Sequence, residues 1–151
     1  MTRQYRIQKV TGEPDWDKIE KAPLDQRLWR PCEAISAYAQ LAYDESRLYV
    51  HLHAEEAQIR AENSGVLDQP CQDSCLEFFA SFDAHSQKYM NFEMNANGAY
   101  LASVRTNKAD KRMVADLTAA LPVVRAERGA GIWSVETLFT EDFIRDCFDG
   151  C

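Results

Sequence analysis

Two glutamates, Glu77 and Glu93, are the residues of this sequence best suited to chemistry. Each stands in a short run in which apolar and polar residues alternate. Two carboxyl groups about 5 to 9 Å apart can serve as the acid and base of a glycosidase. Carboxylates can also accept hydrogen bonds from sugar hydroxyls, or stand solvated on an outer surface. The residue types leave these three roles open, and we assign no catalytic residue.

Three further polar residues, Tyr89, Asn91 and Asn95, accompany Glu93 at intervals of two. Phenol and amide groups both donate and accept hydrogen bonds, which suits sugar hydroxyls. A polar ladder between neighbouring strands is the simpler interpretation of the same pattern. We take Glu77, Tyr89, Asn91, Glu93 and Asn95 as candidate ligand-binding residues.

An aromatic ring is the natural partner for the apolar C–H face of a sugar, because ring contact adds binding beyond simple burial. Trp16 and Trp133 lie in patterns typical of core residues. Trp29 lies in an irregular segment between Arg27 and Arg30. Trp29 is therefore the candidate stacking residue.

The segments that must position these side chains are predicted to be strands. Over 75–82 and 89–96 every second residue is apolar, as expected of strands with one buried face. Asn97-Gly98 tolerates positive φ and predicts a turn. A third strand is expected over 99–105. The candidate ligand-binding residues would share the polar face of this meander.

The remaining segments extend the same pattern. Alternation predicts hairpins over 34–43 with 48–54 and over 123–127 with 131–138, and an edge strand over 3–10. Short helical turns are expected within 16–22, 57–62, 106–121 and 140–145. The pattern predicts an all-β fold, an antiparallel β-sandwich of jelly-roll or immunoglobulin-like type with one or two short helices. Residues 1–151 are expected to form one domain.

Composition narrows the classes of partner. A formal net charge of −7 argues against nucleic acid, which requires clustered cations. No apolar run is long enough to span a membrane, and no signal peptide is visible. Five cysteines are an odd count, which favours free thiols and a cytoplasmic location. Their two C-x3-C pairs lack the usual spacing of a zinc site.

Metal ligands are sparse. His51 and His53 lie two apart on one predicted strand face, without an evident third ligand. Asp44, Asp73 and Asp83 could offer oxygen atoms to calcium, although aspartates are common at turns and strand ends. We expect no cofactor, with calcium as the weaker alternative.

Five motifs in order point to a known family. They are W-D-K-I-E-K-A from Trp16, A-Y-D-E-S-R-L-Y-V-H-L from Ala42, Q-D-S-C-L-E-F-F from Gln72, K-Y-M-N-F-E-M-N-A-N-G from Lys88, and G-I-W-S-V-E-T from Gly131. From about Trp16 to Leu138, the chain resembles the family 9 carbohydrate-binding modules and the proteins related to them.

The resemblance implies a β-sandwich that binds a mono- or oligosaccharide without catalysis and accompanies glycoside hydrolases in polysaccharide catabolism. Characterised members hold the end of a sugar chain between two aromatic platforms, and some hold structural calcium. Two positions differ here: Cys71 stands near the place of a stacking tryptophan, and Met90 in place of an arginine.

The resemblance also bears on the end of the chain. Proteins of this kind continue through further strands after the region that matches Cys147 to Cys151. It therefore implies either a domain that is incomplete at its C-terminus or an unpaired edge strand that a second copy completes, giving a homo-oligomer.

We therefore expect a non-catalytic sugar-binding protein, in which an aromatic surface stacks on the sugar while Glu77, Asn91 and Glu93 order its hydroxyls. One alternative is a small glycoside hydrolase that cleaves O-glycosyl bonds with Glu77 and Glu93. The other is a sandwich module that binds a protein or another ligand without affinity for sugar.

Overall fold

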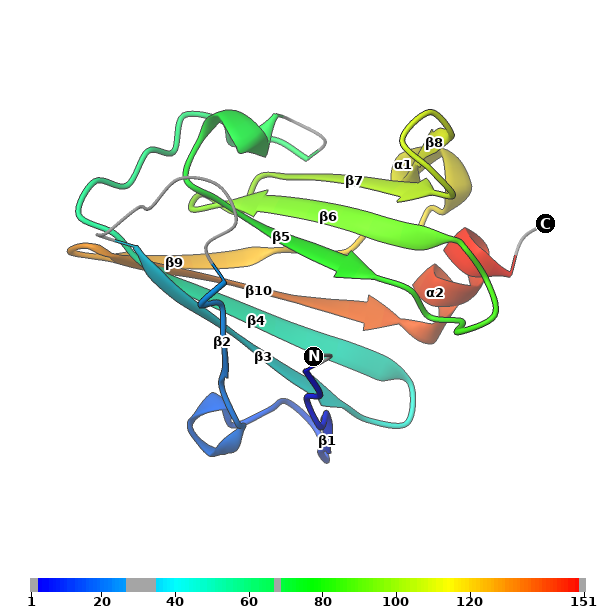
Figure 1. Ribbon diagram of the computed structural model, residues 1–151, viewed down its shortest axis with the longest axis horizontal. Helices are drawn as coiled ribbons and strands as arrows, with labels where there is room; N and C mark the ends of the chain where they lie inside the picture. Colours follow the sequence, from blue (N-terminus) through cyan, green and yellow to red (C-terminus); the bar gives the residue numbers. More distant parts are fainter. Residues whose placement is uncertain (1–2, 27–34, 67–68, 150–151) are drawn as a thin grey trace.

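The computed structural model describes residues 3–26, 35–66 and 69–149, and two β-sheets packed face to face make up most of this part of the chain (Figure 1). The predicted antiparallel β-sandwich is confirmed. The candidate stacking residue Trp29 lies outside the described residues. Within those residues, no helix has the length and apolar character needed to cross a membrane.

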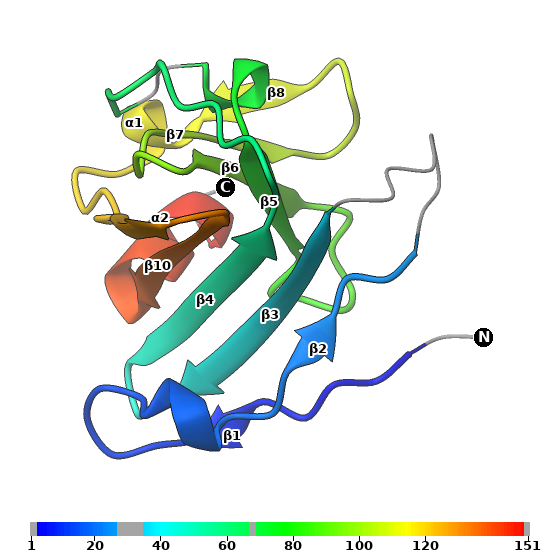
Figure 2. The ribbon, with the colours of Figure 1, turned by 90° about the vertical axis from the view of Figure 1, so that its left-hand side faces the viewer.

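Sheet A contains six strands among the described residues, in the order β1-β3-β4-β10-β9, with β2 also paired to β3. Figure 2 shows β1 and β2 along the outer side of β3. The strands are β1 (Gln8–Lys9), β2 (Ala22–Pro23), β3 (Ser36–Tyr43), β4 (Arg47–Glu55), β9 (Arg125–Gly129) and β10 (Ile132–Thr140).

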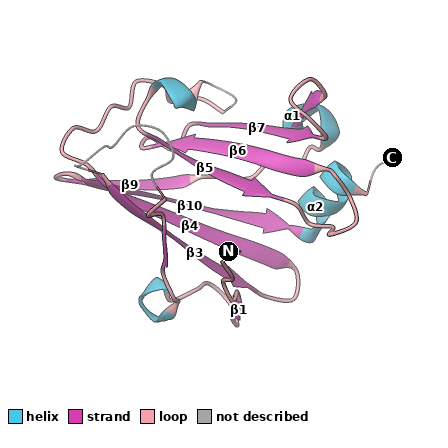
Figure 3. Cartoon of the chain, in the orientation of Figure 1, coloured by secondary structure: helices cyan, strands magenta, loops and turns pink. Residues whose placement is uncertain are grey.

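Sheet B has four described strands in sequence order: β5 (Cys75–Ala80), β6 (Tyr89–Asn95), β7 (Tyr100–Arg105) and β8 (Lys111–Met113). The helical elements are short and lie at the margins of the sheets (Figure 3). They are the 3-10 turns η1 (Trp16–Lys18) and η2 (Pro70–Gln72) and the helices α1 (Val114–Leu117) and α2 (Glu141–Phe148).

The predicted hairpins, the central meander and an edge strand within 3–10 are confirmed, and one other expectation is wrong. The edge strand expected over 3–10 shortens to β1, which runs parallel to β3. The helical turn expected within 57–62 does not form. A 3-10 turn forms instead at η2, where Pro70 occupies the first position, because proline lacks the N–H that this position would leave unbonded.

Aromatic rings join the two sheets at the centre of the core. Phe92 of β6 stacks on Tyr100 with ring centroids 4.7 Å apart and meets Phe139 of β10 edge-on at 5.2 Å. Phe139 in turn contacts Phe143 of α2 at 5.3 Å. All four side chains are almost completely buried, so they exclude water from the space between the layers.

Helix α2 begins directly at the end of β10. The Thr140 hydroxyl accepts a hydrogen bond from the Phe143 amide at 3.1 Å, which caps the helix as the sequence predicts. This cap turns the chain so that Phe143 and Cys147 face the core. Burial raises the pKa of the Cys147 thiol to about 11, so this cysteine behaves as an apolar core residue.

A polar network anchors the long loop before β5 to the turn after β6. The Asp73 carboxylate accepts hydrogen bonds from the Asn63 amide at 2.9 Å and from the Asn95 side chain at 2.8 Å. The Asn97 side chain donates to the Ala61 carbonyl at 2.9 Å. The turn itself needs Gly98, whose φ is +81°. The loop is therefore bonded to the turn at two positions, Asn95 and Asn97.

Asp73→Asn is predicted to destabilise the protein at pH 7. Burial alone would raise the pKa of Asp73, but the Asn63, Glu62 and Asn95 donors outweigh it and lower the pKa to about 2. We expect a loss of about 1.5–3 kcal/mol in the free energy of unfolding, as for hydrogen bonds to a charged group. Urea unfolding measures it.

The contribution of Asp73 to the free energy of unfolding changes with pH in a defined direction. Because the folded pKa is depressed, the stabilisation by Asp73 is present above about pH 4 and is lost as the pH falls through about 2. The difference in the free energy of unfolding between wild type and Asp73→Asn should therefore shrink as the pH is lowered from about 4 to about 2. Asp83→Asn, in an exposed turn, is the control and should change stability little. A difference that does not vary with pH would contradict the role given to Asp73.

Candidate functional site

The antiparallel register of β5 and β6 brings the two candidate glutamates together. Glu77 lies directly opposite Glu93, and Phe79 lies opposite Asn91. Directly opposed residues have Cβ atoms about 4.5–5.5 Å apart and share one face. This outer face of sheet B, formed by Glu77, Phe79, Tyr89, Asn91 and Glu93, is called the glutamate face below.

The two carboxylates face each other across β5 and β6. Within the described part of the chain, neither Glu77 nor Glu93 forms an ion pair. Burial and, second, the negative charge of Glu93 raise the pKa of Glu77. Burial and the same two carboxylates raise the pKa of Cys75 to about 12, which keeps its thiol protonated. The face therefore offers strong acceptors to a ligand rich in hydrogen-bond donors.

Asn91 fixes the orientation of one carboxylate. Its side-chain amide donates to Glu93 Oε1 at 2.8 Å. Asn91 is 7% exposed, and its Oδ1 atom is buried without a hydrogen-bond partner among the described residues. A buried acceptor of this kind is costly to leave unpaired.

Phe79 is a further candidate site residue, which sequence reasoning missed. Its ring is 56% exposed and lies 6.3 Å from the Tyr89 ring between centroids. The signal was available in the alternation of 75–82, which places Phe79 on the same face as Glu77. An exposed phenylalanine beside two carboxylates supplies the apolar platform that a sugar ring can contact.

Two other residues considered from the sequence, Asn95 and Met90, do not lie on the glutamate face in a position to bind a ligand. Asn95 has both side-chain atoms engaged, donating to Asp73 and Asn63 and accepting from the Asn97 and Ala99 amides, so it holds the turn. Met90 is completely buried and points into the core. An arginine on the glutamate face could not come from that position, because Met90 faces inward.

The candidate metal ligands do not converge. Among the described residues, no three of the His, Cys, Asp and Glu side chains are placed to hold a metal ion. Asp44 accepts from the Ser46 amide and the Tyr49 hydroxyl, while Asp83 accepts from the His85 amide. Each aspartate thus stabilises its own turn, and these residues do not fit a shared calcium site.

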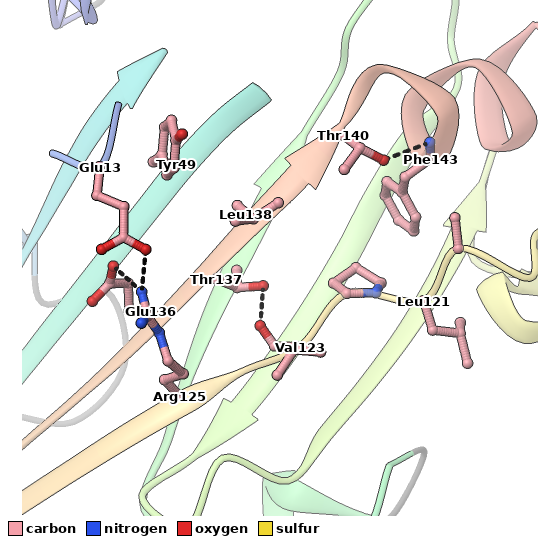
Figure 4. Close-up of a pocket in the computed structure, with 12 residues that line it drawn as sticks. Glu13, Tyr49, Leu121, Val123, Arg125, Glu136, Thr137, Leu138, Thr140 and Phe143 are labelled. Atoms are coloured by element: carbon pink, nitrogen blue, oxygen red, sulfur yellow. Dashed lines mark hydrogen bonds and ion pairs between the residues drawn. The ribbon is translucent and has the colours of Figure 1, made fainter. Parts of the chain in front are cut away.

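A pocket of about 440 Å³ lies at the other sheet, where β10 passes the segment before β9 (Figure 4). Its lining is mainly apolar and includes Leu121 and Val123, with the Thr137 hydroxyl donating to the Val123 carbonyl at 3.0 Å. At one end Arg125 bonds Glu136 at 3.0 Å and approaches Glu13 at 3.8 Å. Two carboxylates thus share one cation, so this cluster keeps a net negative charge.

The placement of the two glutamates argues against hydrolysis. Glycoside hydrolases use two carboxyl groups that flank the scissile bond. Glu77 and Glu93 project from adjacent positions of one sheet face, and so they approach a ligand from the same side. This arrangement suits recognition of hydroxyl groups.

A two-layer β-sandwich with an acidic and aromatic outer face defines a binding module. The model of the family described as "Carbohydrate-binding family 9" matches residues 10–125. The chain therefore belongs to carbohydrate-binding family 9, and its function is carbohydrate binding without catalysis. No curated protein sequence matches it.

Solved structures share the fold. A protein from Bacteroides uniformis, described as carbohydrate-binding, has a TM-score of 0.76 and 20% identity, and the match covers 96% of this chain and 74% of that one. A family 9 module from Caldicellulosiruptor kristjanssonii gives a TM-score of 0.61 and 18% identity in complexes with cellotriose and with glucose. These matches cover 90% of this chain and 67% and 69% of those chains. At these identities the likeness establishes the fold.

Glu77→Gln is predicted to stabilise the protein at pH 7. The raised folded pKa means that protonation of Glu77 contributes stability below about pH 4, which is lost as the pH rises through the folded pKa. Removing the charge of Glu77 should raise the free energy of unfolding by about 0.2–1 kcal/mol, the range for cross-strand pairs. Urea unfolding at pH 7 and pH 4 measures this gain, which should fall toward zero at the lower pH.

The exposed Glu20, which forms no ion pair among the described residues, provides the control Glu20→Gln. It should leave stability unchanged at both values of pH. If Glu77→Gln lowers stability at pH 7, Glu77 has a stabilising partner and the repulsion assigned to Glu93 is wrong.

Proposed function

We propose that the glutamate face binds the sugar, with one pyranose ring over Phe79 and its hydroxyls donating to Glu77 and Glu93. The observation that carries this proposal is the pair of directly opposed carboxylates, which have no ion-pair partner in the part of the chain that the structure describes, beside a 56% exposed aromatic residue. Carboxylates are strong acceptors, and charge-assisted hydrogen bonds are about twice as strong as neutral ones.

Hydrogen bonds behind the two carboxylates hold the site in place. Asn91 holds the Glu93 carboxylate through its side-chain amide. On β7, Ser103 lies directly opposite Asn91. The Ser103 hydroxyl accepts a hydrogen bond from Arg105 Nε at 3.1 Å, so the neighbour of Asn91 is itself held in place. The acceptors thus need no reorganisation before a ligand arrives, which reduces the entropic cost of binding.

The class of sugar follows from the solved relatives. The Caldicellulosiruptor kristjanssonii module was solved with glucose and with cellotriose. We propose a glucose-containing mono- or oligosaccharide for this chain, and a role beside enzymes that degrade polysaccharides. The homo-oligomer through an edge strand and the cytoplasmic location stay predictions. The free thiols of Cys71, Cys75 and Cys147 support a reducing compartment.

Titration calorimetry with glucose, xylose, galactose, cellobiose and cellotriose tests the proposal. We expect heat of binding with at least one of these sugars. Glu77→Gln and Glu93→Gln should each weaken binding about tenfold, because each removes a charge-assisted hydrogen bond. Phe79→Ala should weaken it several-fold through the lost ring contact, roughly 0.5–1.5 kcal/mol.

Two variants away from the glutamate face serve as matched controls. Glu20→Gln removes an exposed carboxylate, and Tyr43→Ala removes an exposed ring at the end of β3. Both should bind sugar as the wild type does. No heat with any sugar, or equal losses in the controls and the site variants, would sink the proposal.

A further inference from the structure

A second polar surface covers the outer face of sheet A. The register aligns Tyr38, His53, Ser134 and Glu127 in one row across four strands. The next row contains Gln40, His51, Glu136 and Arg125. Polar and aromatic side chains thus occupy eight successive outward positions on the sheet opposite the glutamate face.

Trp16 of η1 turns part of this surface into a pocket. Its ring stacks on His51 with centroids 5.2 Å apart and planes 22° apart. The pocket that these two rings help to line has a volume of about 370 Å³. A smaller pocket of about 220 Å³ adjoins it and shares four lining residues, Trp16, His51, Glu127 and Ser134. The larger volume falls within the usual range for small-molecule sites, about 300–1,000 Å³. This space is called the histidine pocket below.

Gln40 fixes the hydrogen-bonding role of His51. The buried Gln40 amide donates to the Trp16 and Ile19 carbonyls, each at 2.7 Å, so its orientation is unambiguous. Its Oε1 atom can only accept, and it lies 2.9 Å from His51 Nδ1. Nδ1 therefore carries the proton, which leaves Nε2 of the neutral ring as an acceptor.

Burial is the main reason that His51 is neutral near pH 7. It lowers the pKa of His51, and the neighbouring His53 and Lys21 act in the same direction. Glu136 and Glu127 oppose this shift, but the net direction is downward. No described residue bonds Nε2, so the acceptor is available to a ligand.

The lining as a whole has no net charge. Two cations, Lys21 and Arg128, balance two anions, Asp17 and Glu127. Lys21 Nζ lies 4.5 Å from the centre of the Tyr38 ring, and the His53 and His51 rings lie 4.6 and 6.2 Å from it. A neutral lining that mixes donors, acceptors and aromatic edges favours a neutral molecule with several hydroxyl groups over an ion.

We propose that the histidine pocket is a second ligand site that takes a neutral polyhydroxylated molecule such as a single sugar unit. A ligand hydroxyl donates to His51 Nε2, while the Ser134 hydroxyl and Lys21 supply donors. The pocket lies on the opposite sheet from the glutamate face, and the proposal does not depend on binding there. Two sites on one domain would let the protein bridge two sugar chains or two parts of one chain.

The three histidines of the chain make imidazole NMR a direct test. His51 and His53 line the pocket, whereas His85 lies in the exposed β5–β6 turn and serves as an internal control. The probes are glucose, xylose, galactose, mannose and myo-inositol at millimolar concentrations. We expect at least one to shift the His51 and His53 signals without shifting those of His85. Nitrogen shifts should show the proton of His51 on Nδ1.

Variants separate this site from the glutamate face. His51→Phe keeps an aromatic ring beside Trp16 but removes the acceptor, and it should weaken the response of His53 roughly tenfold. Ser134→Ala, a milder change, should weaken it several-fold if His51→Phe fails to fold. Glu77→Gln with Phe79→Ala should leave the response unchanged.

Three results would overturn the proposal. One is that none of the probes shifts His51 or His53, even if calorimetry detects sugar at the glutamate face. Another is that the response disappears in the Glu77→Gln, Phe79→Ala variant, because the shifts would then report binding on the other sheet. The third is a proton on His51 Nε2, which would remove the acceptor.

Discussion

The contact between Phe92 and Phe139 is the constraint on which the rest of the structure depends. These rings meet at 5.2 Å where sheet B faces sheet A, and both are completely buried. Because side chains alternate along a strand, the inward position of Phe92 forces its neighbours Asn91 and Glu93 outward. The same rule on β10 places Leu138 on the outer face. The core thus determines which side chains are available to a ligand.

Alternation alone was enough to predict the sandwich, its hairpins and four residues of the glutamate face, Glu77, Tyr89, Asn91 and Glu93. It could not predict contacts between distant segments. Asn95 has the same spacing as Asn91, but Asp73, 22 positions earlier, engages its amide. The placement of Trp16 over His51 joins residues 35 positions apart, and no local pattern reports it. Phe79 was on the predicted face and was missed because a phenylalanine in a strand is more often buried.

The two outer faces differ in electrostatics, although both are polar. The glutamate face has two carboxylates, and burial together with the negative charge of Glu93 raises the pKa of Glu77 and slightly destabilises the fold at neutral pH. Such an unfavourable pair is typical of a surface kept for binding. The outer face of sheet A balances its charges and fixes its groups through Gln40. The first face therefore suits strong donors, and the second suits a ligand that both donates and accepts.

The central claim is that the sugar lies on the glutamate face. A crystal structure of the protein grown with the sugar that binds most tightly in solution tests it most directly. The account predicts a pyranose ring over Phe79, with hydroxyls within hydrogen-bonding distance of the Glu77 and Glu93 carboxylates. A sugar bound elsewhere, with the glutamate face unoccupied, would contradict it.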